Sequence, residues 1–171
     1  MCARQGVWCG DYKADKGESL YRRSMYTFWK RAAPPAQMEI LNAPTRETCA
    51  VRRERTNTPL QALLTLNDIQ FVEAARHLAQ RTVKEGGDKF ETRLDLMAKR
   101  LLARPFAVKE AAVVRRVHDE LLAHYKAHLE EAKKLIAVGE SKADATLDVA
   151  TLAAWTMVAN QLMNLDEVLN K

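Results

Sequence analysis

Three arginines stand directly in front of a predicted helix, in the segment VRRERTNTPLQALLTLND that begins at Val51. The first backbone N–H groups of a helix have no partner within the helix, and nearby cations add positive potential, so such a helix start can bind an anion. Hydroxyl and amide side chains that follow the arginines could add hydrogen bonds. The candidate residues for binding an anion or a partner are therefore Arg52, Arg53, Arg55, Thr56, Asn57 and Thr58.

The same arginines could instead be structural. They could pair with Glu47, Glu54 or acidic residues of later helices and hold the preceding loop against the helices, because ion networks that perturb charged groups are often structural. We prefer this structural interpretation. The alternative, in which a carboxylate, sulfate or phosphate group binds at the helix start, stays open.

Two histidines have the spacing of a zinc pair. His124 and His128 are four residues apart and would share one face of a helix. A zinc site needs at least a third ligand, and Glu120 or Glu131 would have to converge on the pair. We interpret the two histidines as part of the wet face of a charged helix, and we predict no metal site.

No catalytic residue can be named from the sequence. Cys49 and His77 could be a thiol nucleophile and its base, but nothing in their spacing brings them together. The metalloprotease motif, the glycine-rich phosphate loop and the serine-hydrolase elbow do not occur. We expect no cofactor in this chain, and we predict a protein that is not an enzyme on its own.

The segment LYRRSMYTFWKR, from Leu20, combines basic and aromatic residues. Tyr21, Met25 and Phe28 recur at helical spacing, which favours a helix over a strand, and the two prolines at 34 and 35 would end it. Arginines beside aromatic rings could contact phosphates and stack on bases, but no nucleic-acid-binding motif accompanies them. We therefore expect these rings to be core residues and regard nucleic-acid binding as the least favoured function.

The composition indicates a helical protein with an uneven charge. The chain has 171 residues, of which 47% are apolar and 29% charged, with few glycines and prolines. The net charge of +5 lies in the first third, because residues 1–60 carry 11 Lys and Arg against 6 Asp and Glu. Such asymmetry indicates an acidic partner, either upstream domains of a parent protein or another acidic protein surface. No apolar run approaches the ~18 residues of a membrane span.

The first well-defined helix begins after the arginines. Thr58 is a favourable N-cap and Pro59 fits the first helical position, where its missing N–H costs nothing. Leu60, Leu63 and Leu64 are predicted to form the buried stripe of this helix.

Further helices follow from caps and apolar periodicity. The pair at residues 67 and 68 predicts a break and a new cap, and the glycines at 86 and 87 predict an end. Asp88 with Glu91 predicts the start of the next helix. Gly139 predicts the end of a later helix, and Asp148 predicts the start of the last helix. A break is also predicted near Ala127. The predicted core-facing residues of these helices are Phe71, Val72, Ala75, Leu78, Ala79, Val83, Leu94, Met97, Ala98, Leu101, Leu102, Ala112, Val113, Val117, Leu121, Leu122, Tyr125, Leu152, Trp155, Ala159, Leu162 and Met163.

These patterns predict an all-α fold, an irregular bundle of about five to seven helices with an ordered, loop-rich N-terminal third. Residues 1–18 are predicted to be a poorly structured lead-in that is the remnant of an upstream domain. Residues 19–171 are predicted to form a single helical domain. Within it, residues 19–57 form the basic aromatic segment and loop, and residues 58–171 form the bundle.

Four segments carry a family resemblance, namely LYRRSMYTFWKR, RRERTNTPLQALLTLND, FVEAARHLAQR and LAAWTMVANQLMNLDEVL. They resemble the C-terminal domain of unknown function in large planctomycete cytochrome-c-associated proteins, from about Glu18 to Leu169. The resemblance departs at Ile69 and near Leu129, where relatives often have proline. Those relatives are exported, and many begin with a c-type cytochrome domain, so the resemblance implies a truncated copy whose signal sequence and haem domain lay upstream.

The resemblance implies an extracytoplasmic location, although this chain shows no signal peptide, and it supplies no catalytic residue. Our first functional hypothesis is a non-catalytic helical scaffold or interaction module, the C-terminal part of an exported cytochrome-c-associated protein. The alternative is an enzyme domain or accessory that binds an anionic substrate, sulfated or carboxylated, within an electron-transfer assembly. Haem c is implied only for the upstream domain of the family.

Overall fold

The computed structural model describes residues 15–30, 33–52 and 54–170, and the described residues are helical, with no β-strand among them. The all-α prediction is therefore confirmed. The described residues contain eight α-helices, six of which have seven residues or more. Within the same residues, none of the helices combines the length and apolar character needed to span a membrane. The chain divides into two compact units, residues 1–56 and 57–171, and each is described by itself.

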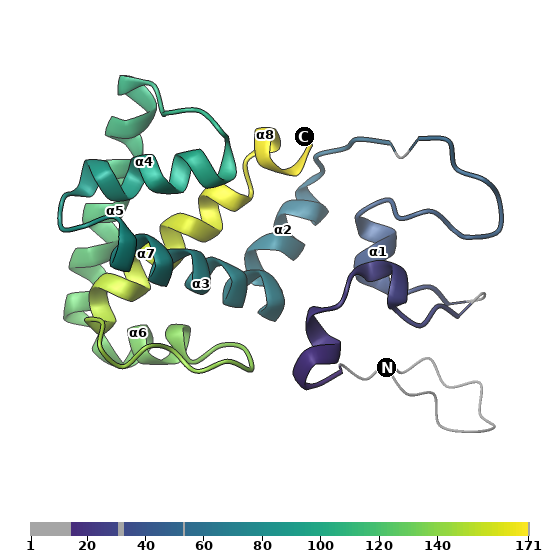
Figure 1. The fold of residues 1–171 in the computed structure, drawn as a ribbon, viewed down its shortest axis with the longest axis horizontal. Coiled ribbons are helices and arrows are strands. Elements are labelled where there is room, and N and C mark those ends of the chain that lie inside the picture. The colour runs from purple at the N-terminus through teal and green to yellow at the C-terminus, as the bar shows by residue number, and fades with distance from the viewer. Residues whose placement is uncertain (1–14, 31–32, 53, 171) are drawn as a thin grey trace. The chain divides into compact units, whose positions relative to one another are not determined.

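The first unit contains short helical turns joined by irregular backbone (Figure 1). Two 3₁₀ turns span Gly17–Tyr21 and Ser24–Tyr26, and helix α1 spans Ala36–Ile40. The predicted continuous helix through this basic aromatic segment is therefore wrong over the residues that the structure describes. Residues 1–14 of the predicted lead-in (residues 1–18) lie outside the described residues.

Arg46 gives a physical reason for the short turns. Its guanidinium group donates to the backbone carbonyls of Ser24 at 3.3 Å and of Met25 and Thr27 at 3.5 Å. The same group lies over the Trp29 ring, 5.0 Å from its centroid. These bonds occupy carbonyl oxygens that a continuous helix would offer to its own N–H groups, so the segment is held in turns instead.

Most apolar side chains of the basic aromatic segment are exposed, and Leu20 and Trp29 are half-buried. Tyr21, Met25 and Tyr26 are 61%, 65% and 69% exposed, and Phe28 is 46% exposed. The expectation that these rings form core is therefore wrong. The short turns place the side chains on no common inward face, because 3₁₀ turns lack the continuous stripe of an α-helix.

The second unit is a helical bundle. Its helices are α2 (Pro59–Asn67), α3 (Ile69–Glu85), α4 (Phe90–Leu101), α5 (Val108–Ala127), α6 (Leu129–Ile136), α7 (Val149–Met163) and α8 (Asp166–Leu169). The predicted break at Ala127 is confirmed, because α5 ends there and α6 begins two residues later.

Helix α7 is the centre of this unit, and each of the other six helices contacts it (Figure 1). Its side chains are buried on nearly all sides, with Ala153, Ala154 and Ala159 fully inaccessible. Trp155 packs its ring against Phe90 of α4, at 5.4 Å between centroids. A helix that is apolar all round must be surrounded, which explains why the bundle forms around this segment.

The predicted caps at three helix starts are confirmed. Thr58 accepts a hydrogen bond from the Gln61 N–H, and the Gln61 side chain accepts from the Thr58 N–H, which completes a capping box. Asp68 caps α3 through the N–H of Gln70 at 2.9 Å. Asp148 caps α7 in the same way. These bonds satisfy backbone donors that a helix leaves open.

The predicted apolar stripe of α2 is wrong. Leu60 and Leu63 are 55% and 60% exposed, whereas Gln61 and Thr65 are buried. Thr65 Oγ1 lies 2.6 Å from Oδ1 of Asn164, just after α7, so a polar contact fixes the inward face of α2. The capping box also fixes the position of Gln61 on the inward face of α2, because its side chain must accept the N–H of Thr58.

Two details of the middle helices also differ from the prediction. Helix α4 begins one residue later than expected, with Lys89 and not Asp88 at the cap position. The inward face of α5 includes the buried His118, while Ala112 and Val113, predicted to be buried, are exposed. Apolar periodicity correctly predicted helix α5, but it placed two exposed residues of its first turns in the buried stripe. Elsewhere the core prediction is confirmed at buried positions that include Val72, Ala75, Ala79, Leu94, Met97, Ala98, Leu102, Tyr125, Leu152, Trp155, Ala159 and Leu162.

Candidate functional site

The structure describes five of the six residues predicted to bind an anion or a partner. Arg52 and Arg55 are exposed, and neither forms a hydrogen bond or ion pair in the described part of the chain. Arg53 lies outside the described residues. The arginines and the helix start belong to different units, so their use as one site stays a prediction.

The three polar residues of the same set have separate local roles. Thr56 accepts a hydrogen bond from the Asn42 side chain at 2.6 Å within the first unit. Asn57 donates to Asp166 at the start of α8, at 3.3 Å. Thr58 is the N-cap of α2. Each side chain therefore stabilises backbone or a neighbouring side chain near its own position.

The helix start that was expected to receive an anion is largely satisfied by its own residues. The capping box uses the N–H groups of Thr58 and Gln61, and Pro59 has none. In the first turn of α2, the N–H of Leu60 is the donor without a partner among the described residues. A single free donor gives little anchorage to an anion compared with the several that phosphate-binding helix starts offer.

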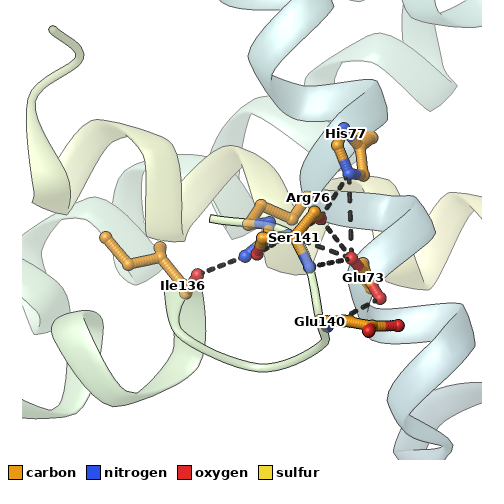
Figure 2. A network of polar contacts seen from close by, with 6 residues as sticks. All are labelled: Glu73, Arg76, His77, Ile136, Glu140 and Ser141. Atoms are coloured by element: carbon orange, nitrogen blue, oxygen red, sulfur yellow. Dashed lines mark hydrogen bonds and ion pairs between the residues drawn. The ribbon is translucent and has the colours of Figure 1, made fainter. Parts of the chain in front are cut away.

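A polar network that the sequence analysis did not identify lies inside the second unit (Figure 2). Glu73 and Arg76 are one turn apart on α3 and are 2% and 0% exposed. They face the loop between α6 and α7, where Ser141 meets both side chains. Charged side chains of these types are rarely buried unless they are paired, so this pair is the most unusual polar feature of the unit.

Arg76 ties α3 to the loop through several hydrogen bonds. Its guanidinium group donates to the carbonyl of Ile136 at 2.6 Å, to the carbonyl of Ser141 at 2.8 Å and to Ser141 Oγ at 2.5 Å. It also lies 3.4 Å from the Glu73 carboxylate. Only its Nε lacks a hydrogen-bond partner among the buried polar atoms of the group. The arginine therefore fixes the end of α6 and the loop that follows.

Glu73 accepts the backbone N–H groups of the same loop. The Ser141 N–H donates to Oε1 at 2.8 Å and the Glu140 N–H donates to Oε2 at 3.2 Å. The Ser141 hydroxyl also bonds to this carboxylate. The loop thus forms an anion-binding nest, and the anion it binds is a side chain of the protein itself.

Gly139 allows the loop to approach this closely. Its φ is +100°, and a Cβ at this position would lie 2.5 Å from the Glu73 carboxylate. The prediction that Gly139 caps the preceding helix is wrong, because α6 ends at Ile136 with Ala137 as its cap. The glycine is required by the turn conformation and by the approach of the carboxylate.

Ser141 and His77 lie in the arrangement of a nucleophile and its base, with Nε2 2.8 Å from Oγ. The surrounding contacts do not suit that chemistry. The hydroxyl already accepts from Arg76 and bonds to the Glu73 carboxylate, which competes with the imidazole for its proton. The N–H groups of residues 140 and 141, which could stabilise an oxyanion, are bonded to Glu73. The arrangement acts as a structural clamp between α3 and the loop.

The sequence contained one signal for this network. Residues 72, 75 and 79 form the predicted apolar face of α3, and positions 73 and 76 lie directly beside that face at helical spacing. An acid and an arginine three residues apart at the edge of an apolar stripe can pair while being buried. The loop residue that completes the network lies 65 positions later in the chain than Arg76, so spacing could not indicate it.

Both histidines are exposed as predicted, but they do not share one helix, because α5 ends at Ala127 and His128 lies between α5 and α6. His124 Nε2 contacts Glu131 at 3.0 Å, and His128 Nδ1 contacts the His124 carbonyl at 3.0 Å. Over the described residues, no group of three or more His, Cys, Asp or Glu is arranged to hold a metal ion. Cys49 is exposed in the first unit, whereas His77 belongs to the second.

A second ion network joins the ends of the helical unit at its surface. Arg104, between α4 and α5, bonds to Glu110 at 3.0 Å and to Glu167 of α8 at 2.8 Å. The hydrogen bond from Arg104 lowers the pKa of Glu110, as does the bond from the Ala107 N–H. All three side chains are partly exposed, so this network orients α8 without forming a buried site.

The fold and these contacts define an all-α protein whose buried charges are used within the fold. Residues 5–118 match the family described as PSD1, Protein of unknown function (DUF1553). The match covers more than half of the chain, and the chain belongs to this family. Neither the curated proteins nor the solved structures include a match to it.

Proposed function

We propose that this chain is a non-catalytic helical interaction module, which docks onto an acidic protein surface through the basic aromatic segment of its first unit. The family match supports a domain of unknown function and does not by itself indicate a reaction. The proposal rests on the chemistry of the exposed side chains and on the internal use of the buried ones.

The observation that carries the proposal is the exposure of apolar and cationic groups in one short stretch of sequence. Tyr21, Met25 and Tyr26 are more than half exposed, and the neighbouring Arg22 and Arg23 are exposed as well. Aromatic and arginine side chains are the groups that protein interfaces use most as anchors. Their positive charge favours a partner surface rich in carboxylates.

The contacts of the helical unit support a structural role for its polar residues. Glu73 and Arg76 bond to the loop between α6 and α7. The Ser141 hydroxyl beside them contacts Arg76, His77 and Glu73. The start of α2 is capped by Thr58 and Gln61. These facts favour the interaction module over the alternative of a domain that binds an anionic substrate, which needs free donors in an accessible site.

We extend the proposal to the context that the resemblance implies. The module would be the C-terminal part of an exported, extracytoplasmic protein, and its partner would be an upstream domain of that protein or another acidic protein. A haem c would belong to the upstream domain, and no cofactor would bind to this chain.

The experiment compares two anionic probes of matched charge. One is a fluorescent acidic peptide in which aspartates and glutamates alternate with leucine and phenylalanine, and the other is a heparin oligosaccharide. We expect the purified chain to bind the peptide more tightly, because the peptide can use both the arginines and the exposed rings. Fluorescence anisotropy at several salt concentrations measures both affinities.

A matched pair of variants locates the interaction. Replacing Tyr26 and Phe28 by serine should weaken peptide binding by about tenfold and leave heparin binding unchanged. Replacing the exposed Leu60 and Leu63 of α2 by serine removes a similar apolar area elsewhere and serves as the control. Tighter binding of heparin than of the peptide, lost when Arg52 and Arg55 are replaced by alanine, would support the anionic-substrate alternative instead.

A further inference from the structure

The second unit has an open groove between α4 and α5, with a volume of about 660 Å³. Six apolar residues line one part of it, namely Phe90, Leu94, Phe106, Val108, Ala111 and Ala112. Small-molecule sites enclose most of their ligand, whereas a groove that is open along its length suits a peptide segment.

The groove follows one regular face of α5. Its lining residues on that helix, from Val108 to Glu120, recur at intervals of three and four, so they form a single stripe along the helix. The stripe begins with Val108, Ala111 and Ala112 and ends with charged residues. The two alanines leave room for the side chains of a second helix to approach the backbone of α5.

Some apolar residues of α5 that periodicity predicts to be buried are exposed in the structure. Periodicity predicted that Ala112 and Val113 would be buried, yet both are exposed, and Val108 is 87% exposed. Exposed apolar groups that lie singly need no explanation, but Val108 and Ala112 line the groove together with two phenylalanines. The pattern therefore indicates a surface that is covered when a partner is bound.

The charged residues that line the groove indicate the charge of the partner that would bind there. Four carboxylates line it, from Glu91, Asp95, Asp119 and Glu120, against two arginines. Arg115 pairs with Glu91, and Arg116 lies 3.9 Å from Glu120. Asp119 contacts the ring of the neighbouring His118, 3.1 Å from its Nδ1, and the four carboxylates of the groove still outnumber its two arginines.

We infer that this groove binds an amphipathic helix of a partner protein, whose apolar residues enter between α4 and α5 and whose lysines or arginines face the surplus carboxylates. The excess of negative charge opposes nucleic acid and anionic lipid and favours a cationic segment. The surface lies in the second unit and carries the opposite charge to the basic aromatic segment. It is therefore separate from the surface in the proposed function.

The test uses two synthetic peptides of about 18 residues that form amphipathic helices. Both have leucines at helical spacing on one face. One has lysines flanking the leucines and the other has glutamates at the same positions. We expect the chain of 171 residues to bind the lysine peptide about tenfold or more tightly than the glutamate peptide, with the difference shrinking as salt is added.

Two variants make the test specific. Ala112→Arg places a long cation in the groove and should weaken binding of the lysine peptide by about tenfold. Ala74→Arg adds the same side chain at an exposed position of α3, outside the groove, and should leave binding unchanged. Circular dichroism confirms that both variants are folded.

Several outcomes would overturn the inference. They are equal binding of the two peptides, absence of binding to both, equal effects of Ala112→Arg and Ala74→Arg, and binding to phosphatidylserine vesicles in place of the lysine peptide. A variant with Arg52 and Arg55 replaced by alanine should still bind the lysine peptide. This control separates a failure of the groove from a failure of the basic segment.

Discussion

Arg76 of the helical unit and the pair Arg52 and Arg55 of the first unit have opposite environments. Arg76 is fully buried in the helical unit and bonds to two backbone carbonyls, a hydroxyl and a carboxylate. Arg52 and Arg55 in the first unit are exposed and have no such partner within the described residues. From the sequence, we singled out the run of arginines before α2. The buried arginine that holds α3 to the loop between α6 and α7 is instead Arg76, a single residue beside the apolar face of α3.

This comparison separates stability from recognition. A buried guanidinium group that loses its contacts leaves desolvated carbonyls and a desolvated carboxylate behind, so its removal is costly. An exposed guanidinium group has water as its partner and is available to a ligand. We therefore expect substitutions around Arg76 to change unfolding and substitutions at the exposed arginines to change binding.

The largest effect is expected for Arg76→Met, which keeps most of the apolar stem and removes the charged head. The free energy of unfolding should fall by about 3–5 kcal/mol, because Glu73 is left buried without its cation. Urea denaturation measures the change. The control is Arg81→Met on the same helix, where an exposed pair with Glu85 is removed, and the expected change is below about 0.5 kcal/mol. Equal effects of the two substitutions would contradict the clamp.

A glycine pair gives the next largest effect. Gly139→Ala should destabilise the fold by about 1–3 kcal/mol, because a positive φ is combined with a Cβ that meets Glu73. Gly87→Ala is the matched control, since its φ is +67° but the space around its Cβ is open. Its cost should be close to about 1 kcal/mol. Thermal melting of both variants measures the difference, and an equal loss would show that the contact with Glu73 is unimportant.

Acid should weaken the helical unit through the loop that carries Ser141. Hydrogen bonds from Lys84 and Thr146 lower the pKa of Asp144, and Thr151 lowers the pKa of Asp148. Groups whose pKa is lower in the folded state contribute stability that is present above their ordinary pKa, about 4, and is lost as the pH falls. Urea denaturation between about pH 6 and pH 3 should show this loss. The loss should be smaller in Asp144→Asn, and the same slope in both proteins would refute the assignment.

The smallest change in stability is expected at the exposed arginines. Replacing Arg52 and Arg55 by alanine should change the free energy of unfolding by less than about 0.5 kcal/mol, because neither side chain has a bonded partner among the described residues. Differential scanning calorimetry measures this. A clear drop in melting temperature would support the structural interpretation of these residues that the sequence favoured.

Local signals predicted much of the fold correctly. Thr58 and Asp148 were identified as caps from residue type and position, and each forms a capping side-chain bond. The pair at residues 67 and 68 was identified as the third cap, and Asp68 is the residue of the pair that fills this role. Apolar periodicity identified the inward faces of α3, α4 and α7. These features depend on residues within a few positions of one another, which is why the sequence reveals them.

The failures involve partners that are distant in the sequence. The leucines of α2 fit an apolar stripe, but the inward face is set by Thr65 and its contact with Asn164. The segment from Tyr21 to Phe28 has helical spacing, but Arg46 bonds to its carbonyls. The buried network at Glu73 needs a loop that follows α6. Such contacts depend on tertiary structure, and periodicity contains no information about them.

The most direct test of the account is amide hydrogen exchange at Glu140 and Ser141 in the native chain. If Glu73 holds both N–H groups as described, these loop amides should exchange slowly in the wild type and much faster in Glu73→Gln, while the amides of the nearby exposed residues 145 and 146 change little. Exchange of Glu140 and Ser141 at the rate of an open loop in the wild type would contradict the account. It would show that these donors are free for a ligand and that the network is not a structural clamp.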